Sequence, residues 1–391
     1  MRERRPEWDV RYNVALGGRA YSRDVTRVAL EDIAPEEISL LGYLPKLKTV
    51  VCGGGTEAAA QLQEYCRGSG LEFCVGVGGE SIADSAQKVT VRAITDEELD
   101  LLRLLTEMKQ LHIVEPEASA ENLIRLRDEY PDGAVTWERE ICGVLCTSED
   151  EEIDLSGGKI GSLDQVDAGM AYFPDAERVF LGECGLDNDE LAGYREQVRE
   201  KYKLVWTVSC GDKLKARTDD TTFMPVRERV YYFNDEEAYN LRYCEDMVCI
   251  DIGHMSIHQI DFVEYMPNLE YLILAHTQVQ YIEPIRSCKK LKFLELDWSP
   301  IKDLSPLVDC TALEDLNLGN TYADFDPIGR MTWLKNLWMI GCSRGSAYQM
   351  TQALTDTKVM VSGSATVANG WRNLQNYYDM RDLLGMEYMS W

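Results

Sequence analysis

Three short stretches of this sequence contain residue types that could carry chemistry. The first is a G-x-S-x-G motif at Gly341, Ser343 and Gly345, which in many hydrolases places a serine nucleophile on a sharp turn. In those enzymes the catalytic histidine follows the serine along the chain. Here every histidine precedes it: His112, His254, His258 and His276. The motif is therefore interpreted as a turn, and a hydrolase remains the less favoured alternative.

The second type of stretch is rich in glycine. Gly76, Gly78 and Gly79 resemble part of a phosphate-binding loop but lack its third spaced glycine and the following lysine. Residues 157–159, Gly-Gly-Lys, lack the leading glycine of such a loop. A similar pair, Gly17 and Gly18, also follows alternating apolar residues. These stretches are interpreted as turns, and no cofactor is expected.

The third candidate is a pair of histidines. His254 and His276 are 22 residues apart, and Asp251 lies near the first of them. If both occupy one position of consecutive repeats, they lie on neighbouring strands about 5 Å apart and could share a metal ion. A closed metal site needs further ligands, and Trp298 takes the next equivalent position. We therefore expect no metal and assign the histidines to a binding surface, with a metal-dependent enzyme as a weaker alternative.

The histidine spacing reflects a longer repeat. Leu269, Leu291, Leu313 and Leu334 are 22, 22 and 21 residues apart, and each begins an apolar-x-x-apolar-x-apolar phrase. A period of this length is typical of solenoids, in which stacked strands bury one continuous apolar column. Each phrase is followed by a short side chain that can bond main-chain groups at a turn: Thr277, Ser299, Thr321 and Cys342.

The phrases resemble the 22-residue, internalin-like type of leucine-rich repeat, with its L-x-x-L-x-L-x-x-T-x-I-x-x-I-x-P-L pattern, over residues 246–343. The resemblance implies an α/β horseshoe and a non-catalytic recognition module, most often bacterial, that binds a protein or peptide on its concave strand face. By the same analogy the protein would be secreted or at the cell surface if an export signal has been removed, and cytoplasmic otherwise.

The residues between the leucines point away from the core, and several are aromatic. We expect an exposed binding patch on the concave face, formed by Tyr271, Ile273, His276, Phe293, Glu295, Trp298, Asn317 and Trp338. The alternative is that some of these side chains pack on neighbouring loops or on a cap. A carbohydrate or cell-wall ligand is the alternative to a protein, because sugars also bind aromatic platforms with nearby acids.

Composition narrows the classes of partner. The 391 residues carry a formal net charge of −27, which opposes binding to nucleic acid and to anionic membranes. The sequence contains no apolar run of the length that a membrane-spanning helix needs. None of the 12 cysteines forms a C-x-x-C pair, so we interpret most of them as small, reduced core residues.

The N-terminal half repeats at a longer period. Tyr12, Phe73, Trp137 and Trp206 are 61, 64 and 69 residues apart within similar alternating segments. Between them we expect strand, helix, strand and helix three times, at 25–30, 35–44, 47–52 and 57–65, at 89–91, 96–105, 111–114 and 120–130, and at 153–155, 163–172, 178–181 and 189–202.

The predicted architecture is therefore an α/β leucine-rich-repeat solenoid in four parts. Residues 1–211 form divergent long-unit repeats that continue the horseshoe, and 212–245 form a connecting segment. Residues 246–345 form the regular repeats, and the aromatic segment 346–391 forms a C-terminal cap over the open end of the solenoid. The alternatives are a separate α/β domain at the N-terminus and a partner-binding tail at the C-terminus.

Overall fold

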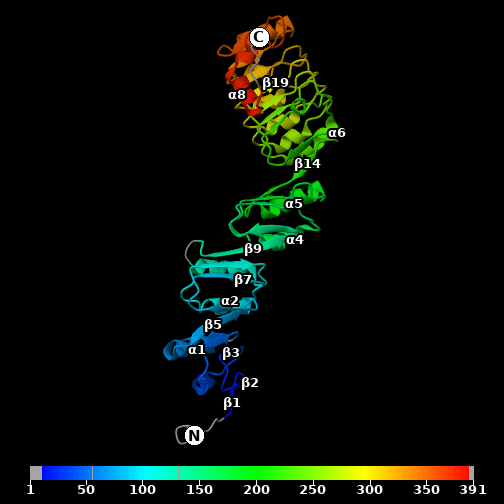
Figure 1. The fold of residues 1–391 in the computed structure, drawn as a ribbon. Helices are drawn as coiled ribbons and strands as arrows, with labels where there is room; N and C mark the ends of the chain where they lie inside the picture. The colour runs from blue at the N-terminus through cyan, green and yellow to red at the C-terminus, as the bar shows by residue number, and fades with distance from the viewer. Residues whose placement is uncertain (1–10, 55, 131–132, 387–391) are drawn as a thin grey trace. The chain divides into compact units, whose positions relative to one another are not determined.

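The computed structural model describes residues 11–54, 56–130 and 133–386 of an α/β protein (Figure 1). The predicted Tyr388 and Trp391 of the C-terminal aromatic segment lie outside the described residues. The protein divides at Val179 into two compact units, whereas the sequence suggested a boundary near residue 211. Among the described residues, no helix combines the length and the apolar character that crossing a bilayer requires.

The second unit contains the regular repeats, and the predicted leucine-rich-repeat solenoid is confirmed there. Its sheet has seven parallel strands in sequence order. They are β16 (Thr222–Phe223), β17 (Cys249–Asp251), β18 (Tyr271–Ile273), β19 (Phe293–Glu295), β20 (Asp315–Asn317), β21 (Asn336–Trp338) and β22 (Lys358–Met360). Neighbouring strands are in register, so that Leu272 pairs with Leu294 and Leu294 with Leu316.

Short helices return the chain between these strands. Six of those that the structure describes are 3-10 helices, in which the tight turn fits the compact repeat: η3 (Pro225–Glu228), η4 (Tyr239–Tyr243), η5 (Asp261–Tyr265), η6 (Glu283–Ser287), η7 (Ser305–Asp309) and η8 (Ile328–Arg330). The remaining returns use α6 (Asp235–Ala238) and α7 (Arg344–Ala353). The segment that was expected only to connect the two halves thus supplies β16, the first strand of the sheet.

The leucine column forms the core as the sequence predicted. Leu269, Leu291 and Leu313 are fully buried. At the turn, the Thr277 hydroxyl donates to the carbonyl of Leu274 at 2.7 Å, and the Ser299 hydroxyl donates to the same carbonyl from the next repeat at 2.7 Å. These bonds satisfy main-chain groups inside the stack, which confirms the role expected for the short polar residues.

The first unit contains the long repeats. Its parallel strands are β3 (Arg27–Leu30), β4 (Thr49–Cys52), β5 (Glu72–Val77), β7 (Lys88–Arg92), β8 (Gln110–Val114) and β9 (Val135–Ile141). The strand β11 (Glu152–Asp154) follows, and β12 (Arg178–Phe180) runs across the boundary after Val179. The helices of this unit are η2 (Pro35–Tyr43), α1 (Thr56–Ser69), α2 (Asp96–Leu102), α3 (Ala120–Glu129) and α4 (Leu163–Met170). The second unit begins with α5 (Asn188–Val198) and β13 (Lys203–Val205). The repeated order of strand, helix, strand and helix is confirmed, although η2 is a 3-10 helix.

The structure adds antiparallel return strands that were not expected. The hairpins pair β1 (Asn13–Leu16) with β2 (Arg19–Ser22), β5 with β6 (Glu80–Ala83), β9 with β10 (Val144–Thr147), and β14 (Thr207–Ser209) with β15 (Lys215–Arg217). In the first unit, the parallel strands therefore come in groups of three, β3–β5 and β7–β9, each closed by an antiparallel strand. This differs from a strand-by-strand continuation of the regular stack.

Glycines make these hairpins possible. Both central residues of the β5–β6 turn, Gly78 and Gly79, have positive φ angles of 57° and 75°. Such a turn matches the twist of the flanking strands and strongly favours glycine. The glycine-rich stretch that resembled a phosphate-binding loop is thus a hairpin turn, as the sequence interpretation held.

A glutamate ties each of the first two hairpins to the following helix. Glu98 accepts hydrogen bonds from the main-chain N–H groups of Gly78, at 3.0 Å, and Thr95, at 2.9 Å. Glu37 accepts in the same way from Gly17 and Ala34. One carboxylate therefore caps the helix and fixes the hairpin turn that precedes it.

We expect Glu98→Ala to leave the amides of Gly78 and Thr95 without their acceptor. Their protection against hydrogen exchange should fall by roughly 1–2 kcal/mol, the usual cost of losing such a bond. Hydrogen-exchange mass spectrometry would measure this. Glu97→Ala, an exposed position on the same turn, is the control. Equal protection of 77–80 and 94–96 in both variants would contradict the assigned role.

Candidate functional site

The turn after each regular strand holds the backbone in the left-handed region. The φ angle is 63° at His254, 57° at His276, 59° at Trp298 and 51° at Asn320. Gly341 occupies the next equivalent position, with a φ of 82°. This conformation is easiest for glycine, is adopted more often by asparagine and histidine than by other residues, and is unfavourable for a bulky residue such as tryptophan. The register of the strands places these five positions next to one another.

Three of the side chains at these positions form a stack that we call the ring ladder: His254, His276 and Trp298. The rings of His254 and His276 are 4.5 Å apart between centroids and 14° from parallel. Those of His276 and Trp298 are 5.7 Å apart and 18° from parallel. The predicted proximity of the two histidines is confirmed. Within the described residues, no group of three or more His, Cys, Asp and Glu side chains could hold a metal ion.

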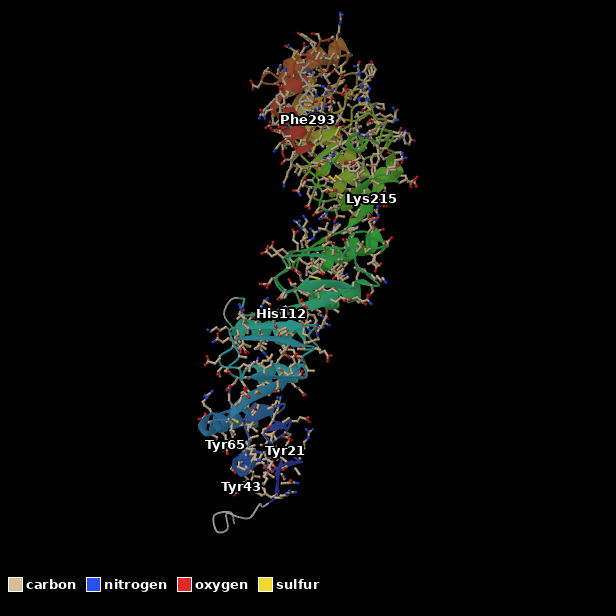
Figure 2. The ribbon with its side chains drawn as sticks, in the orientation of Figure 1. Tyr21, Tyr43, Tyr65, His112, Lys215 and Phe293 are labelled. Carbon is tan, nitrogen blue, oxygen red and sulfur yellow. The ribbon has the colours of Figure 1, made fainter. Side chains whose placement is uncertain are left out.

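The expected exposed patch on the concave strand face is wrong for six of its eight residues. The buried residues are Tyr271, Ile273, Phe293, Glu295, Asn317 and Trp338. They are covered by the C-terminal segment, which we define as residues 361–386 and which contains η9 (Trp371–Asn373) and α8 (Gln375–Leu383). Figure 1 shows α8 beside β19, and Figure 2 labels Phe293 in this part of the unit. Four of these six side chains are apolar or aromatic and two are polar, and the C-terminal segment of the same chain covers them all.

Trp371 is the centre of this cover. It is fully buried, and its ring lies 4.8 Å from that of Phe293 and 5.2 Å from that of Trp338 between centroids. The indole N–H of Trp338 donates to the carbonyl of Ala368 at 2.8 Å. Tyr377 and Met380 of α8 join the same apolar cluster. The segment expected to cap the open end therefore packs along the strand face that was expected to be concave and open.

Polar side chains under the segment are matched as well. The indole N–H of Trp371 donates to Glu295 Oε2 at 3.0 Å, and the Thr366 hydroxyl donates to Asp297 Oδ2. Asn376 donates to Asp315 Oδ2 at 2.9 Å. Burial, reinforced by the neighbouring charge of Asp297, raises the pKa of Glu295 to about 8. At neutral pH the pair of carboxyl groups therefore holds one proton.

The C-terminal segment leaves one edge of the repeats open. A cleft of about 580 Å³ lies between the ring ladder and the loop 363–367 of the segment. Its lining also includes Glu295, Asp297, Asn320 and Arg372. Trp298 remains 55 % exposed there, and His254 and His276 are also exposed. Desolvation, and then the neighbouring His254, lower the pKa of His276, so that it is neutral at pH 7.

Three of the eight predicted residues, His276, Glu295 and Trp298, thus line the cleft, and two of them, His276 and Trp298, are exposed there. Sequence reasoning missed the other wall, formed by 363–367 and Arg372, because nothing periodic marks these residues. The composition of two segments could have indicated that they pack on each other. The C-terminal segment and the concave face are both rich in aromatic residues, which is what two surfaces that bury each other require.

The serine of the G-x-S-x-G motif has a structural role. Ser343 is the N-cap of α7, and its hydroxyl accepts from the N–H of Ser346 at 3.1 Å. The other hydroxyl contact is to Ser346 Oγ at 2.8 Å. Capping by serine is a common way to satisfy the first N–H groups of a helix. The turn interpretation of the motif is therefore confirmed.

Comparisons with known proteins show a low overall likeness. No protein-family model matches the chain, and no curated protein matches it. Among solved structures, an internalin (inlF) of Listeria monocytogenes is 15 % identical, with a TM-score of 0.32, over 89 % of this chain and 91 % of that one. A leucine-rich-repeat protein of Leptospira interrogans is 13 % identical, with a TM-score of 0.27, over 86 % and 96 %.

Internalin C2 of Listeria monocytogenes is 16 % identical, with a TM-score of 0.26, over 36 % of this chain and 76 % of that one. The assignment of leucine-rich repeats rests on the chain itself, on the 22-residue spacing and the in-register parallel strands. The regular half of this protein is a leucine-rich-repeat solenoid.

The buried Glu295 predicts a pH dependence of stability. Its pKa is about 8 in the folded protein, against an ordinary value of 4.5. The folded state therefore keeps a proton that the unfolded state loses, and this contribution to the free energy of unfolding declines as pH rises from about 4.5 through about 8. In Glu295→Gln the contribution is absent.

We expect the melting temperature of the wild type to fall relative to that of Glu295→Gln between about pH 5 and about pH 9. Differential scanning calorimetry in matched buffers would measure the difference. Glu264→Gln, an exposed position on the outer side of the repeats, controls for the loss of a carboxylate. A difference between wild type and Glu295→Gln that is constant across the pH range would contradict the assignment.

Trp371→Ala should remove the central apolar contact between the C-terminal segment and the strand face. The change takes a fully buried indole from between Phe293 and Trp338, and we expect a loss of about 3–5 kcal/mol in the free energy of unfolding. Limited proteolysis should then cut within 361–386 before the repeats. Urea unfolding gives the stability, with the exposed Tyr348→Ala as control. A loss no larger than that of the control would show that the segment packs loosely.

Proposed function

We propose that the protein is a non-catalytic recognition module that binds a protein or peptide partner at the cleft beside the ring ladder. One observation carries this proposal: three aromatic rings are stacked and exposed at left-handed backbone positions. The proposal keeps His276 and Trp298 from the expected patch. It moves the binding site from the strand face, which the chain itself covers, to the open edge.

The backbone conformation supports a role beyond folding. Holding a bulky residue at positive φ costs on the order of 1–2 kcal/mol, and such costs gather at functional sites. Asn320 and Gly341 show that the same turn forms with residues that suit it better. The exposure of Trp298 means that core packing does not offset the cost at that position. A contact between Trp298 and a partner would offset this conformational cost.

The surroundings of the rings also suit recognition. A rigid solenoid fixes the ring ladder, so little side-chain freedom is lost when a partner binds. Exposed tryptophans next to concave surfaces are frequent centres of binding energy in protein interfaces. The opposite wall, 363–367, begins with the exposed Gly363 and Ser364, and a glycine has no side chain to cover its main-chain groups. An extended peptide can use such groups as hydrogen-bond partners.

Panning of a random peptide phage library on the immobilised full-length protein would test the proposal. Selected peptides are then synthesised, and their affinity is measured by isothermal titration calorimetry. We expect Trp298→Ala to weaken binding by about 30-fold, since loss of a central aromatic contact costs about 2 kcal/mol or more. Tyr348→Ala removes an equally exposed aromatic side chain elsewhere on the unit and should bind as the wild type does.

The variants separate the outcomes because Trp298 and Tyr348 are both on the surface, so that folding should be preserved in each. Circular dichroism and melting curves check this. Peptides that bind the wild type and Trp298→Ala equally would place recognition elsewhere. A library that yields no binder to the wild type would contradict the proposed function.

A further inference from the structure

The floor of the cleft contains a buried carboxylate that is incompletely satisfied. Asp297 is only 2 % exposed, and its Oδ2 accepts the Thr366 hydroxyl. Its Oδ1 has no hydrogen-bond donor in the part of the chain that the structure describes. The neighbouring Glu295 is the group that can offer a proton, and it holds that proton only below a pH of about 8. At neutral pH the protonated Glu295 can serve this atom, so the feature that favours a ligand with hydrogen-bond donors is the buried negative charge of Asp297 itself.

The ring ladder, which forms one wall of the cleft, ends at the exposed ring of Trp298. The ring ladder runs from His254 through His276 to Trp298, and the next two positions hold Asn320 and Gly341. Asn320 leans onto Gly341, where a Cβ atom would lie only 2.2 Å from its Oδ1. No ring continues the stack at these two positions, and Trp298 is more than half exposed. A flat group can therefore continue the stack on Trp298.

The charges at the cleft suit a cation. Asp297 is a carboxylate, and the lowered pKa of His276 keeps that ring uncharged at neutral pH. Arg372 also lines the cleft and its positive charge acts on Glu295, whereas its Nη1 donates to the Tyr377 hydroxyl of α8 at 2.9 Å. The net charge of −27 on the whole chain adds a long-range attraction for basic partners.

We propose that the cleft recognises an arginine side chain of the partner, with its guanidinium plane on Trp298 and its N–H groups directed toward Asp297. This inference rests on the proposed function and names the chemical class of the ligand. A guanidinium is flat, stacks on aromatic rings and donates several hydrogen bonds in one plane to a carboxylate. A lysine ammonium lacks the plane, and a neutral amide lacks the charge.

The probes are three blocked pentapeptides, Gly-Gly-X-Gly-Gly, in which X is arginine, lysine or citrulline. Citrulline keeps the flat shape of arginine and removes its charge. Each is titrated into the full-length protein, and the indole ¹⁵N–¹H signal of Trp298, assigned by its absence in Trp298→Leu, is followed by NMR. We expect the arginine peptide to shift this signal saturably and to bind at least about tenfold more tightly than the citrulline peptide.

Two substitutions test the assigned contacts. Asp297→Asn removes the charge but keeps an acceptor for Thr366, and Trp298→Leu removes the aromatic face at an exposed position. Both should weaken binding of the arginine peptide by about tenfold or more, the second measured by calorimetry. Asp356→Asn makes the same charge change at an exposed site away from the cleft and should leave binding unchanged.

The outcomes distinguish this inference from the proposed function. Equal binding of the arginine and citrulline peptides, or full binding to a folded Asp297→Asn, would overturn the guanidinium site. If no pentapeptide shifts Trp298 while phage-selected peptides still bind and depend on Trp298, the inference fails and the recognition module stands. If panning yields no binder to the wild type, the proposed function itself fails.

Discussion

The in-register stacking of short parallel strands is the constraint on which the regular half of this protein depends. Each position of one repeat lies beside the same position of the next, as Leu272 lies beside Leu294. A residue type that recurs at one position of the repeat therefore forms a column of neighbouring side chains across the stacked strands. The leucine column fills the core, and the threonine and serine column closes hydrogen bonds at the turn. The same rule collects the residues between the leucines on the opposite face.

That second face explains the C-terminal segment. Phe293 and Trp338 belong to one apolar cluster on this face, two strands apart, and apolar surface exposed to water costs about 25 cal/mol per Å². Trp371 covers both rings. The acids that lie among the rings would be costly to bury alone, and the segment supplies donors for them in Trp371, Thr366 and Asn376. Apolar and polar groups are thus matched across one interface within the chain.

How far the sequence could predict this structure follows from the range of each interaction. The leucine period, the turn hydroxyls and the order of helices and strands depend on residues within about one repeat of each other, and all were predictable. The antiparallel strands were missed although Gly78-Gly79 is a strong hairpin signal. The cover of the concave face was missed because its contacts join distant residues: Glu295 and Trp371 are 76 positions apart, and Asp297 and Thr366 are 69. No periodicity links such pairs, so His276 and Trp298 were placed correctly at an open surface while Phe293 and Glu295 were not.

At the left-handed position after each strand, the fold requires a backbone conformation but not a particular side chain. Elsewhere in the described chain the turn after a strand is made by Ala93 and Glu115, at φ angles of 51° and 49°. The turn therefore needs no aromatic residue, and three consecutive rings at His254, His276 and Trp298 are not explained by the backbone. They lie on the edge that the C-terminal segment leaves uncovered. The C-terminal segment fills the strand face and leaves this edge open, so under the proposed function this edge is where a partner would contact the repeats, and the three rings lie there.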